Sequence, residues 1–476
     1  MIMNAKSIIL FVVALILTVG ILVSCTNYGE GNNETTVDSD QKEFCGGLDR
    51  VNYEGKEYKI LTFSDYALTF AHEESGAGTM EDAVYRQCVT VEDYFNVKVM
   101  PVLDAGVSET LRTAVSSGED AFDIVICHNQ VLADHANEGN LTDLNILPNL
   151  DLSKEYWNQT YVDKLTVNDR IYLAFGDLFY EAAASNVHMF YFNKTMIEDL
   201  TLESPYENVY NGTWTVEKLK TMSKDAVKDL NGDNAYSVED DQFGLTIAPV
   251  QAAVMFYTSG FHVFSYDGSN VTLDFYNEKY TDFYSDVYDL LYNTESVHTQ
   301  VDGAPNFQAF LDGRALFTSW FFTDTASVRA VEGFDVGLLP YPKWSEDEEY
   351  INWPTAGNFL MGVPSSVVAE RYAFVGNITQ ALAATGNEFL RSAFYEKTLK
   401  GKLSRDEDSE KMIDIIFETM TIDFGWINCG TGSMGWFTNT CLEAKLPSTS
   451  SLYNRLSEKG LQYYEDVMSY YNQDIE

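Results

Sequence analysis

Between residues 58 and 126, short apolar segments alternate with segments of helical spacing. Residues 58–63, 96–100 and 122–126 are apolar or alternate in polarity, which is typical of β-strands. Residues 80–95 and 111–117 carry apolar side chains three and four positions apart, as one face of an α-helix does. Because nearly continuous apolar strands need cover on both faces, we predict an α/β fold with a parallel sheet between helices.

The rest of the chain continues this pattern. We expect strands at residues 171–175 and 187–192, and a helix after Trp214 that Thr215 caps. From Glu388 onward the spacing is mostly helical. No period of 20–50 residues repeats, which excludes a solenoid. The chain has 476 residues, more than one hydrophobic core usually serves, so two or three domains are expected.

The chain is strongly acidic. It has 30 Lys and Arg against 72 Asp and Glu, a formal net charge of −42. A phosphate backbone would repel such a chain, so nucleic acid is excluded as a partner. An anionic lipid surface would repel it as well unless a covalent link holds it there. The 30 Tyr and 29 Phe are more than a core readily accommodates, and we expect some of them to form a stacking surface for a ligand.

The N-terminal segment has the organisation of an export signal. A positively charged start and a long apolar run are followed by the tetrapeptide LVSC, which ends at Cys25. A single transmembrane anchor is the alternative, since the run is nearly long enough to span a bilayer. The tetrapeptide resembles the bacterial lipobox, which implies cleavage before a lipid-modified cysteine. We therefore predict a signal peptide at residues 1–24, a flexible tether at 25–50, and anchoring to the outer face of the bacterial cell membrane.

Five cysteines follow the predicted cleavage site and Cys25, so at least one of them is unpaired. They are Cys45, Cys88, Cys127, Cys429 and Cys441. Cys88 lies on the apolar stripe of the helix predicted at residues 80–95, and we expect it in the core. Cys429 and Cys441 are close enough in sequence for a short-loop disulfide, although spacing alone does not fix the pairing.

Ligands of open α/β sheets bind beyond the carboxyl ends of the strands. The loops that follow the first, third and fourth predicted strands hold Asp65 and Tyr66, Asn129 and Gln130, and Asp177. These are polar and aromatic groups without a nucleophile and its base. The sequence also lacks a P-loop, His-Glu-x-x-His, Cys-x-x-Cys and Gly-x-Ser-x-Gly. We therefore predict a binding protein and not an enzyme.

Eight segments occur in a characteristic order and spacing. They read DYFNVKV, DIVICHNQVLADHANEGNLTDLN, LTVNDRIYLAFGD, HMFYFNKTMIEDL, WTVEKLKTM, FLDGRALFTSWFF, FDVGLLPYPK and AGNFLMGVP. Together they resemble the family 1 extracellular solute-binding proteins of ABC importers, over about residues 58–442. The resemblance implies a two-lobed, type II periplasmic-binding-protein-like fold, with ligand held in the cleft between discontinuous lobes joined by crossing hinge segments. By similarity, one lobe comprises residues 51–178 and 353–404, and the other 179–352 and 405–476.

The resemblance also implies where a carbohydrate would bind. Trp320 in ALFTSWFF and Trp436 in SMGWF match positions at which sugar-binding relatives place stacking aromatics, because a pyranose has an apolar face that packs on an indole. Core packing is the alternative for each tryptophan. We expect hydrogen bonds to the hydroxyls from the loop residues already named. The full set of expected ligand-binding residues is Asp65, Tyr66, Asn129, Gln130, Asp177, Tyr257, Trp320, Trp353 and Trp436.

Residues 229–240, DLNGDNAYSVED, have the spacing of an EF-hand loop. The expected calcium ligands are the side chains of Asp229, Asn231, Asp233, Ser237 and Asp240 and the backbone carbonyl of Ala235. Position 6 is Asn234 instead of glycine, which is tolerable because asparagine accepts a left-handed backbone. A solvated acidic turn is the alternative. We predict that the loop binds Ca²⁺ as a structural ion.

Three hypotheses for function remain open. The first is a lipid-anchored, monomeric binding protein that captures a carbohydrate, expected to be an oligosaccharide, and delivers it to the permease subunits of an ABC importer. The second is a binding protein of the same kind whose ligand is a peptide or another solute. The third is a surface glycosidase or lyase, because 72 acidic residues guarantee chance pairs of carboxylates at catalytic spacing.

Overall fold

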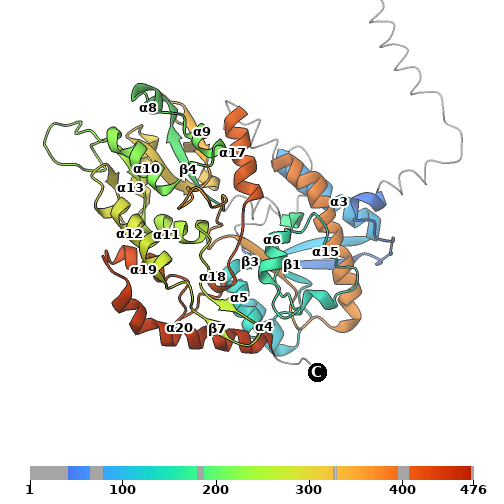
Figure 1. The fold of residues 1–476 in the computed structure, drawn as a ribbon. Helices are drawn as coiled ribbons and strands as arrows, with labels where there is room; N and C mark the ends of the chain where they lie inside the picture. Colours follow the sequence, from blue (N-terminus) through green and yellow to red (C-terminus); the bar gives the residue numbers. More distant parts are fainter. Residues whose placement is uncertain are drawn as a thin grey trace, which may run out of the picture.

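In the computed structural model, the chain forms two lobes, each built around its own β-sheet (Figure 1). The structure describes residues 41–64, 79–179, 187–324, 327–328, 330–394 and 407–472. The predicted signal peptide, Cys25, Asp65 and Tyr66 lie outside this set. No helix within the described ranges is long and apolar enough to cross a membrane. The predicted two-lobed α/β fold class is confirmed.

Lobe 1 is the sheet with strand order β11-β3-β1-β2 and the helices packed on it. Its strands are β1 (Lys56–Thr62), β2 (Val97–Leu103), β3 (Ile124–His128) and β11 (Phe359–Gly362). β1 is parallel to both of its neighbours, whereas β11 is antiparallel to β3. Figure 1 shows helices on both sides of this sheet. They are α3 (Thr79–Phe95) with α15 (Tyr372–Gly386), and α4 (Val107–Ser117) with α5 (Asn129–Asn137).

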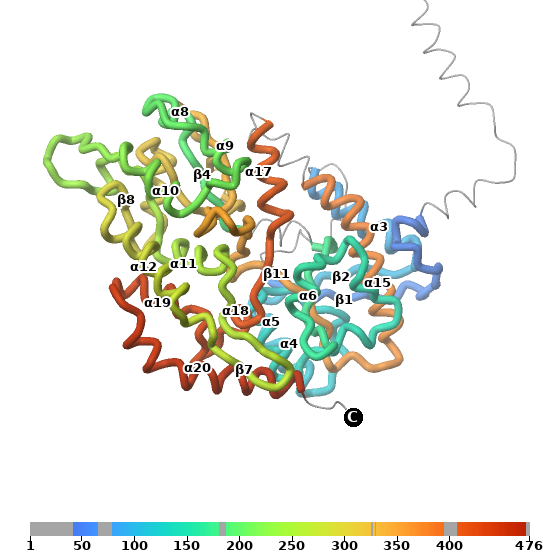
Figure 2. The backbone as a smooth tube through the Cα atoms, viewed as in Figure 1, coloured from blue at the N-terminus to red at the C-terminus, as the bar shows by residue number. Residues whose placement is uncertain are grey.

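Lobe 2 is the sheet with strand order β10-β4-β9-β5-β8 and its helices. The strands are β4 (His188–Asn193), β5 (Phe243–Thr246), β8 (Val297–His298), β9 (Ala315–Phe321) and β10 (Val336–Leu339). The helices include α8 (Lys194–Asp199), α9 (Pro205–Tyr210), α10 (Val216–Ser223), α11 (Pro249–Thr258), α12 (Glu278–Tyr292) and α13 (Ala304–Leu311). The C-terminal helices are α17 (Glu407–Glu418), α18 (Phe424–Ile427), α19 (Phe437–Glu443) and α20 (Ser450–Tyr471). The tube in Figure 2 shows α20 running along the lower edge of the molecule toward the C-terminus.

Most elements predicted from periodicity are present. The strands expected at residues 58–63, 96–100, 122–126 and 187–192 are β1, β2, β3 and β4. The side chain of Thr215 caps α10 by accepting a hydrogen bond from the backbone N–H of Lys218, as expected. The expected strand at 171–175 is wrong, because this buried segment makes only an isolated bridge, Ala174 to Met361. The sheets are also mixed and not all parallel, since β11 and β4 enter them from the opposite direction.

Buried Asn352 joins two segments that run between the lobes. Its backbone N–H donates to Thr419 O at 3.0 Å, and its carbonyl accepts from the Thr421 N–H at 3.1 Å. Its side-chain Nδ2 donates to Thr419 Oγ1 at 2.8 Å, while its Oδ1 accepts from the Tyr341 N–H at 3.2 Å. The segment before β11 and the segment after α17 therefore lie side by side between the two sheets. The residue boundaries proposed for the lobes remain a prediction.

The aromatic excess is largely used inside the protein. The largest fully buried side chains include Tyr58, Tyr94, Tyr161, Tyr172, Tyr191, Tyr280, Tyr341 and Tyr464. Three further tyrosines lie one turn apart on α12, and their hydroxyls donate to carbonyls at and just beyond the end of α19. The bonds are Tyr284 to Leu446 O, Tyr288 to Lys445 O and Tyr292 to Leu442 O, at 2.7, 3.3 and 2.6 Å. Leu442 O is one of the last carbonyls of α19, which have no partner within the helix, and the other two bonds fix the chain just beyond it.

The five cysteines of the described chain are all free thiols. The disulfide suggested by the spacing of Cys429 and Cys441 is therefore absent. Cys441 is buried in α19, whereas Cys429 lies in the loop before that helix and accepts a hydrogen bond from Trp436. Cys88 is buried on α3, as its place on the apolar stripe predicted.

Replacing Asn352 by alanine is expected to destabilise the protein by about 1–3 kcal/mol, because the buried N–H of Tyr341 loses its acceptor. Urea unfolding monitored by tryptophan emission measures the change. The matched control is Asn211→Ala, because Asn211 is exposed at the end of α9. We expect the control to stay within about 0.5 kcal/mol of the parent. Equal effects of the two substitutions would contradict the role given to Asn352.

Candidate functional site

At one edge of the lobe 1 sheet, three rings meet. Since β1 and β3 are parallel, both end there, and antiparallel β11 begins there, with Phe359 opposite His128. The ring centroids of Phe63 and His128 lie 4.8 Å apart, and those of His128 and Phe359 lie 5.2 Å apart. The edge at which sheet ligands bind is therefore aromatic in lobe 1.

The lobe 2 sheet has an equivalent edge. The parallel strands β5 and β9 end there, and β4 begins there, with His188 opposite Phe321. Trp320 occupies this edge and is half-buried. Its ring stacks on Phe307 at a centroid distance of 4.7 Å, and its Nε1 donates to Asp324 Oδ2 at 2.8 Å.

Residues 353–358 connect these two edges directly. The backbone N–H of His188 donates to Trp353 O at 3.0 Å, which fixes one end of the segment to the lobe 2 sheet. The N–H of Asn129 donates to Asn358 O at 2.9 Å, which fixes the other end to lobe 1. Five residue steps span at most about 18 Å, so the two sheet edges lie within that distance of each other along this segment.

Four aromatic side chains pack together beside this segment, and we call them the cleft aromatic group: Tyr257, Trp353, Trp426 and Trp436. Tyr257 and Trp353 are stacked, with centroids 4.2 Å apart and planes 11° apart. Trp426 meets Trp353 edge-on at 5.2 Å and lies 6.1 Å from Trp436. The first three are buried, and Trp436 alone is half-buried. Trp436 therefore packs on Trp426, which the other two rings contact, and it keeps part of its surface accessible.

Tyrosine hydroxyls hold the loop that carries Trp436. Tyr257 donates to the carbonyl of Gly435 at 2.6 Å. The backbone N–H groups of Gly430 and Met434 donate to the hydroxyls of Tyr463 and Tyr464, at 3.0 and 3.2 Å. The Trp436 indole itself donates to Cys429 Sγ at 3.2 Å. Burial raises the pKa of the Cys429 thiol to about 11, so at neutral pH the sulfur stays an uncharged acceptor.

A small cavity of about 40 Å³, which we call the cleft cavity, adjoins the cleft aromatic group. Its walls are mainly apolar and come from β4, α11, the connecting segment and the region of α18 and α19. They comprise His188, Val250, Ala253, Val254, Tyr257, Trp353, Ala356, Trp426, Gly435, Trp436, Thr438 and Asn439. The cavity thus joins the aromatic group to the edge of the lobe 2 sheet.

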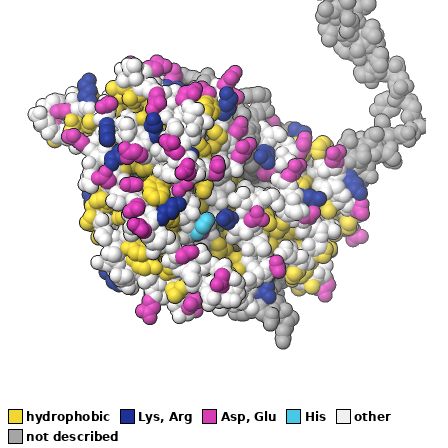
Figure 3. Space-filling view, viewed as in Figure 1, with side chains coloured by type: hydrophobic (Ala, Val, Ile, Leu, Met, Phe, Trp, Pro, Cys, Tyr) yellow, Lys and Arg dark blue, Asp and Glu magenta, His cyan; other side chains and the backbone are white. Residues whose placement is uncertain are grey.

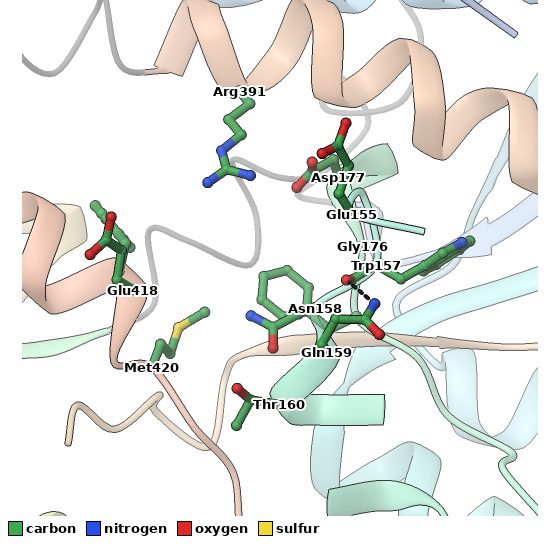
Figure 4. Close-up of a pocket in the computed structure, with 12 residues that line it drawn as sticks. Glu155, Trp157, Asn158, Gln159, Thr160, Gly176, Asp177, Arg391, Glu418 and Met420 are labelled. Carbon is green, nitrogen blue, oxygen red and sulfur yellow. Dashed lines mark hydrogen bonds between the residues drawn. The ribbon is translucent and has the colours of Figure 1, made fainter. Parts of the chain in front are cut away.

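A larger cavity of about 310 Å³, the hinge cavity, is lined by residues 155, 157–160, 175–177, 391, 417, 418 and 420 (Figure 4). Figure 4 shows Asp177 and Glu155 side by side on one wall, Glu418 across from them and Arg391 above. Asp177 accepts a hydrogen bond from Asn387 Nδ2 at 2.7 Å. Burial raises the pKa of Asp177 to about 6 in spite of this bond. Asp177 therefore lines a cavity to which none of the predicted aromatic residues in the described ranges contributes.

The structure brings together only some of the expected ligand-binding residues. Tyr257, Trp353 and Trp436 line one cavity, and Trp320 lies at the edge of the lobe 2 sheet. Asn129 is fully buried, and its side-chain amide donates to Thr355 O at 3.3 Å, so it ties lobe 1 to the connecting segment. Gln130, the next residue of α5, is half-buried.

His188 and Trp426 are among the residues of the cleft cavity that sequence reasoning missed. His188 begins β4, and a rule that inspects only the carboxyl ends of strands overlooks an antiparallel strand that starts at the same edge. Trp426 follows Asp423, whose side chain caps α18 by accepting from the Trp426 N–H at 2.7 Å. A capping aspartate three residues before a tryptophan predicts a helix start, but it carries no information about a cleft.

The predicted calcium loop is closed by its own side chains. The carboxylate of Asp229 accepts hydrogen bonds from the N–H groups of Gly232 and Asn234, at 2.6 and 2.9 Å. Asn234 has a φ of 63°, the left-handed backbone that position 6 requires. Asp241, just beyond the predicted ligands, is buried and accepts from the Leu230 N–H at 2.9 Å. Among the described residues, no three His, Cys, Asp or Glu side chains are grouped as a metal-binding cluster.

On the face of the described chain that Figure 3 shows, the acidic side chains are dispersed. Figure 3 shows acidic side chains scattered over the visible face of both lobes, interspersed with fewer basic ones. The face in view has no large basic patch of the kind that a nucleic-acid-binding protein presents.

Comparison with known proteins shows the fold. No protein-family model and no curated protein sequence matches the chain. Among solved structures, UspC of M. tuberculosis superposes with a TM-score of 0.59 at 14% identity, covering 85% of this chain and 99% of UspC. The ABC substrate-binding protein Lmo0181 of Listeria monocytogenes, in complex with cycloalternan, gives 0.54 at 14% identity, covering 85% and 98%. The maltose/maltodextrin-binding domain MalE of Bdellovibrio bacteriovorus, bound to maltotriose, gives 0.53 at 13%, covering 87% and 100%.

Replacing Asp177 by asparagine is expected to stabilise the protein at neutral pH. The folded state binds the Asp177 proton more tightly than the unfolded chain does, so this group's contribution is present below pH 4 and is lost as pH rises through 6. A difference of about two pKa units corresponds to at most about 3 kcal/mol. The variant should gain on the parent between pH 4 and 7 in urea unfolding. A constant difference across that range would contradict the assignment.

Proposed function

We propose that the protein is an extracytoplasmic solute-binding protein that captures a carbohydrate in the cleft between its lobes and delivers it to an ABC importer. The observation that carries the proposal is the cleft aromatic group. A half-buried indole, Trp436, packs on Trp426, which in turn packs on Trp353 and Tyr257, and it is held by its own hydrogen bond. An indole fixed in this way offers a flat apolar face at low entropic cost, which suits the apolar face of a pyranose.

The two lobes suit capture by closure. The ligand-binding edges of both sheets adjoin one six-residue segment, so a ligand between them contacts both lobes. Binding proteins with this architecture close by a hinge when a ligand bridges the lobes. Two of the structural neighbours are described with bound glycans, cycloalternan and maltotriose, which supports a glycan as the ligand here.

The membrane link is proposed to be a lipid on Cys25. The described chain begins in lobe 1, where Cys45 is fully buried and Phe44 packs against Phe389 at a centroid distance of 5.7 Å. A tether that ends here would attach the membrane anchor to lobe 1 and leave lobe 2 free to move. The covalent lipid would hold this acidic protein at a surface that otherwise repels it.

Substitution of Trp436 by alanine is expected to weaken binding of an oligosaccharide by about 2 kcal/mol, or roughly thirty-fold, as loss of a central aromatic contact does. Titration of the parent with malto-, cello- and xylo-oligosaccharides should also change tryptophan emission. Trp344→Phe serves as the control, because Trp344 donates to Asp286 away from the cavity. A saturable response to peptides with none to any glycan would refute the proposal, and turnover of a glycan would favour the enzyme hypothesis.

We also propose that residues 229–240 bind Ca²⁺ as a structural ion. The spacing of oxygen ligands and the left-handed Asn234 support this, because an EF-hand loop needs its sharp turn at that position. Isothermal titration of chelator-treated protein should show one Ca²⁺ site that Asp229→Ala abolishes. Absence of binding at millimolar Ca²⁺ would leave the loop as a solvated acidic turn.

A further inference from the structure

Two buried nitrogen atoms and one amide oxygen around the cleft cavity lack hydrogen-bond partners. They are Trp353 Nε1, His188 Nδ1 and Asn439 Oδ1. All three belong to side chains that line the same cavity. The Trp353 and His188 side chains are deeply buried, at 2% and 6% exposed. Because buried polar groups in native proteins nearly always have a partner, the cavity calls for an occupant that supplies one.

The hydrogen-bonding capacity of these atoms limits which chemical groups could occupy the cavity. The indole N–H can only donate, and the amide oxygen can only accept. Burial lowers the pKa of His188 to about 3, so its ring is neutral at physiological pH and donates or accepts according to its tautomer. A hydroxyl group both accepts and donates, so it can serve the indole and one of the other two atoms at once. A carboxylate fits poorly, because it cannot donate to the Asn439 oxygen and the cavity offers it no positive charge.

The size and the apolar walls of the cavity indicate that its occupant carries a carbon atom as well as a hydroxyl. A single water needs about 10–15 Å³, and about 40 Å³ is available. Val250, Ala253, Val254 and Ala356 contribute apolar walls. A group of one carbon and one oxygen fills such a space better than a lone water, because its methylene is buried against these side chains.

We propose that the cleft cavity is a subsite for a hydroxymethyl group of the ligand, and that it makes the protein select hexose units over pentose units and uronic acids. This inference rests on the proposed function for the identity of the ligand as a glycan. The hydroxymethyl arm enters beside Trp436, its oxygen accepts from Trp353 Nε1, and its proton is shared with His188 or Asn439. A pentopyranose lacks the arm and leaves these atoms unpaired, which is how a polar subsite rejects an analogue.

The first test needs no knowledge of the glycan. In ¹⁵N-labelled protein, the Trp353 indole resonance is identified by its loss in Trp353→Phe, and the Trp344 resonance by its loss in Trp344→Phe. Glycerol carries hydroxymethyl groups, and we expect it to shift the Trp353 resonance saturably while the solvent-side Trp344 resonance stays in place. An unmoved Trp353 resonance would overturn the inference, whatever glycans the protein binds.

The second test measures selectivity. The unsubstituted protein should bind cello- or malto-oligosaccharides at least about ten-fold more tightly than xylo-oligosaccharides of equal length. Trp353→Phe keeps an aromatic ring on Tyr257 but removes the donor, so it should abolish this preference. Equal weakening for both sugars would show that Trp353 acts only by packing and would overturn the subsite. If no glycan binds at all, the proposed function fails, and the glycerol titration still decides the subsite.

Discussion

The arrangement of the cleft depends on the hydrogen bonds that fix residues 352–358 to both sheets. Asn352 is fully buried and binds the crossing segment at Thr419, and the next residue accepts from His188 of lobe 2. At the other end of the segment, the carbonyl of Asn358 accepts from the N–H of Asn129 of lobe 1. Since five residue steps span at most about 18 Å, residues 353–358 hold these edges of the two sheets near each other while the lobes remain separate packing units.

The aromatic residues around this segment form a graded series from core to cleft. Tyr257 and Trp353 stack in the interior, Trp426 meets them edge-on, and Trp436 reaches the cleft. Close packing of the inner rings fixes the outer one, which is the condition for a stacking platform that loses little entropy on binding. Tyrosines also help to fix Trp436. The hydroxyls of Tyr257, Tyr463 and Tyr464 form hydrogen bonds with the backbone of the loop that carries it.

The order of strands and helices in lobe 1 could be predicted because side-chain periodicity reports local burial, and α3, β1, β2 and β3 are local elements. The segment at residues 171–175 has the same apolar character and yet forms no strand. It lies beside β11, which arrives from nearly 200 residues later and offers it only one bridge. Pairing with a distant strand depends on tertiary structure, so a local sequence pattern cannot predict it.

By itself, the sequence determined the α/β class, the strongly acidic surface, the absence of common catalytic motifs and the residue types available for a cleft. Only the tertiary structure decided which of those residues meet. It placed Tyr257, Trp353 and Trp436 around one cavity and Asp177 at another, and it added His188 and Trp426. The physical reason is that a strand's period fixes which face a side chain takes, whereas crossing segments and antiparallel strands fix which distant side chains share a site.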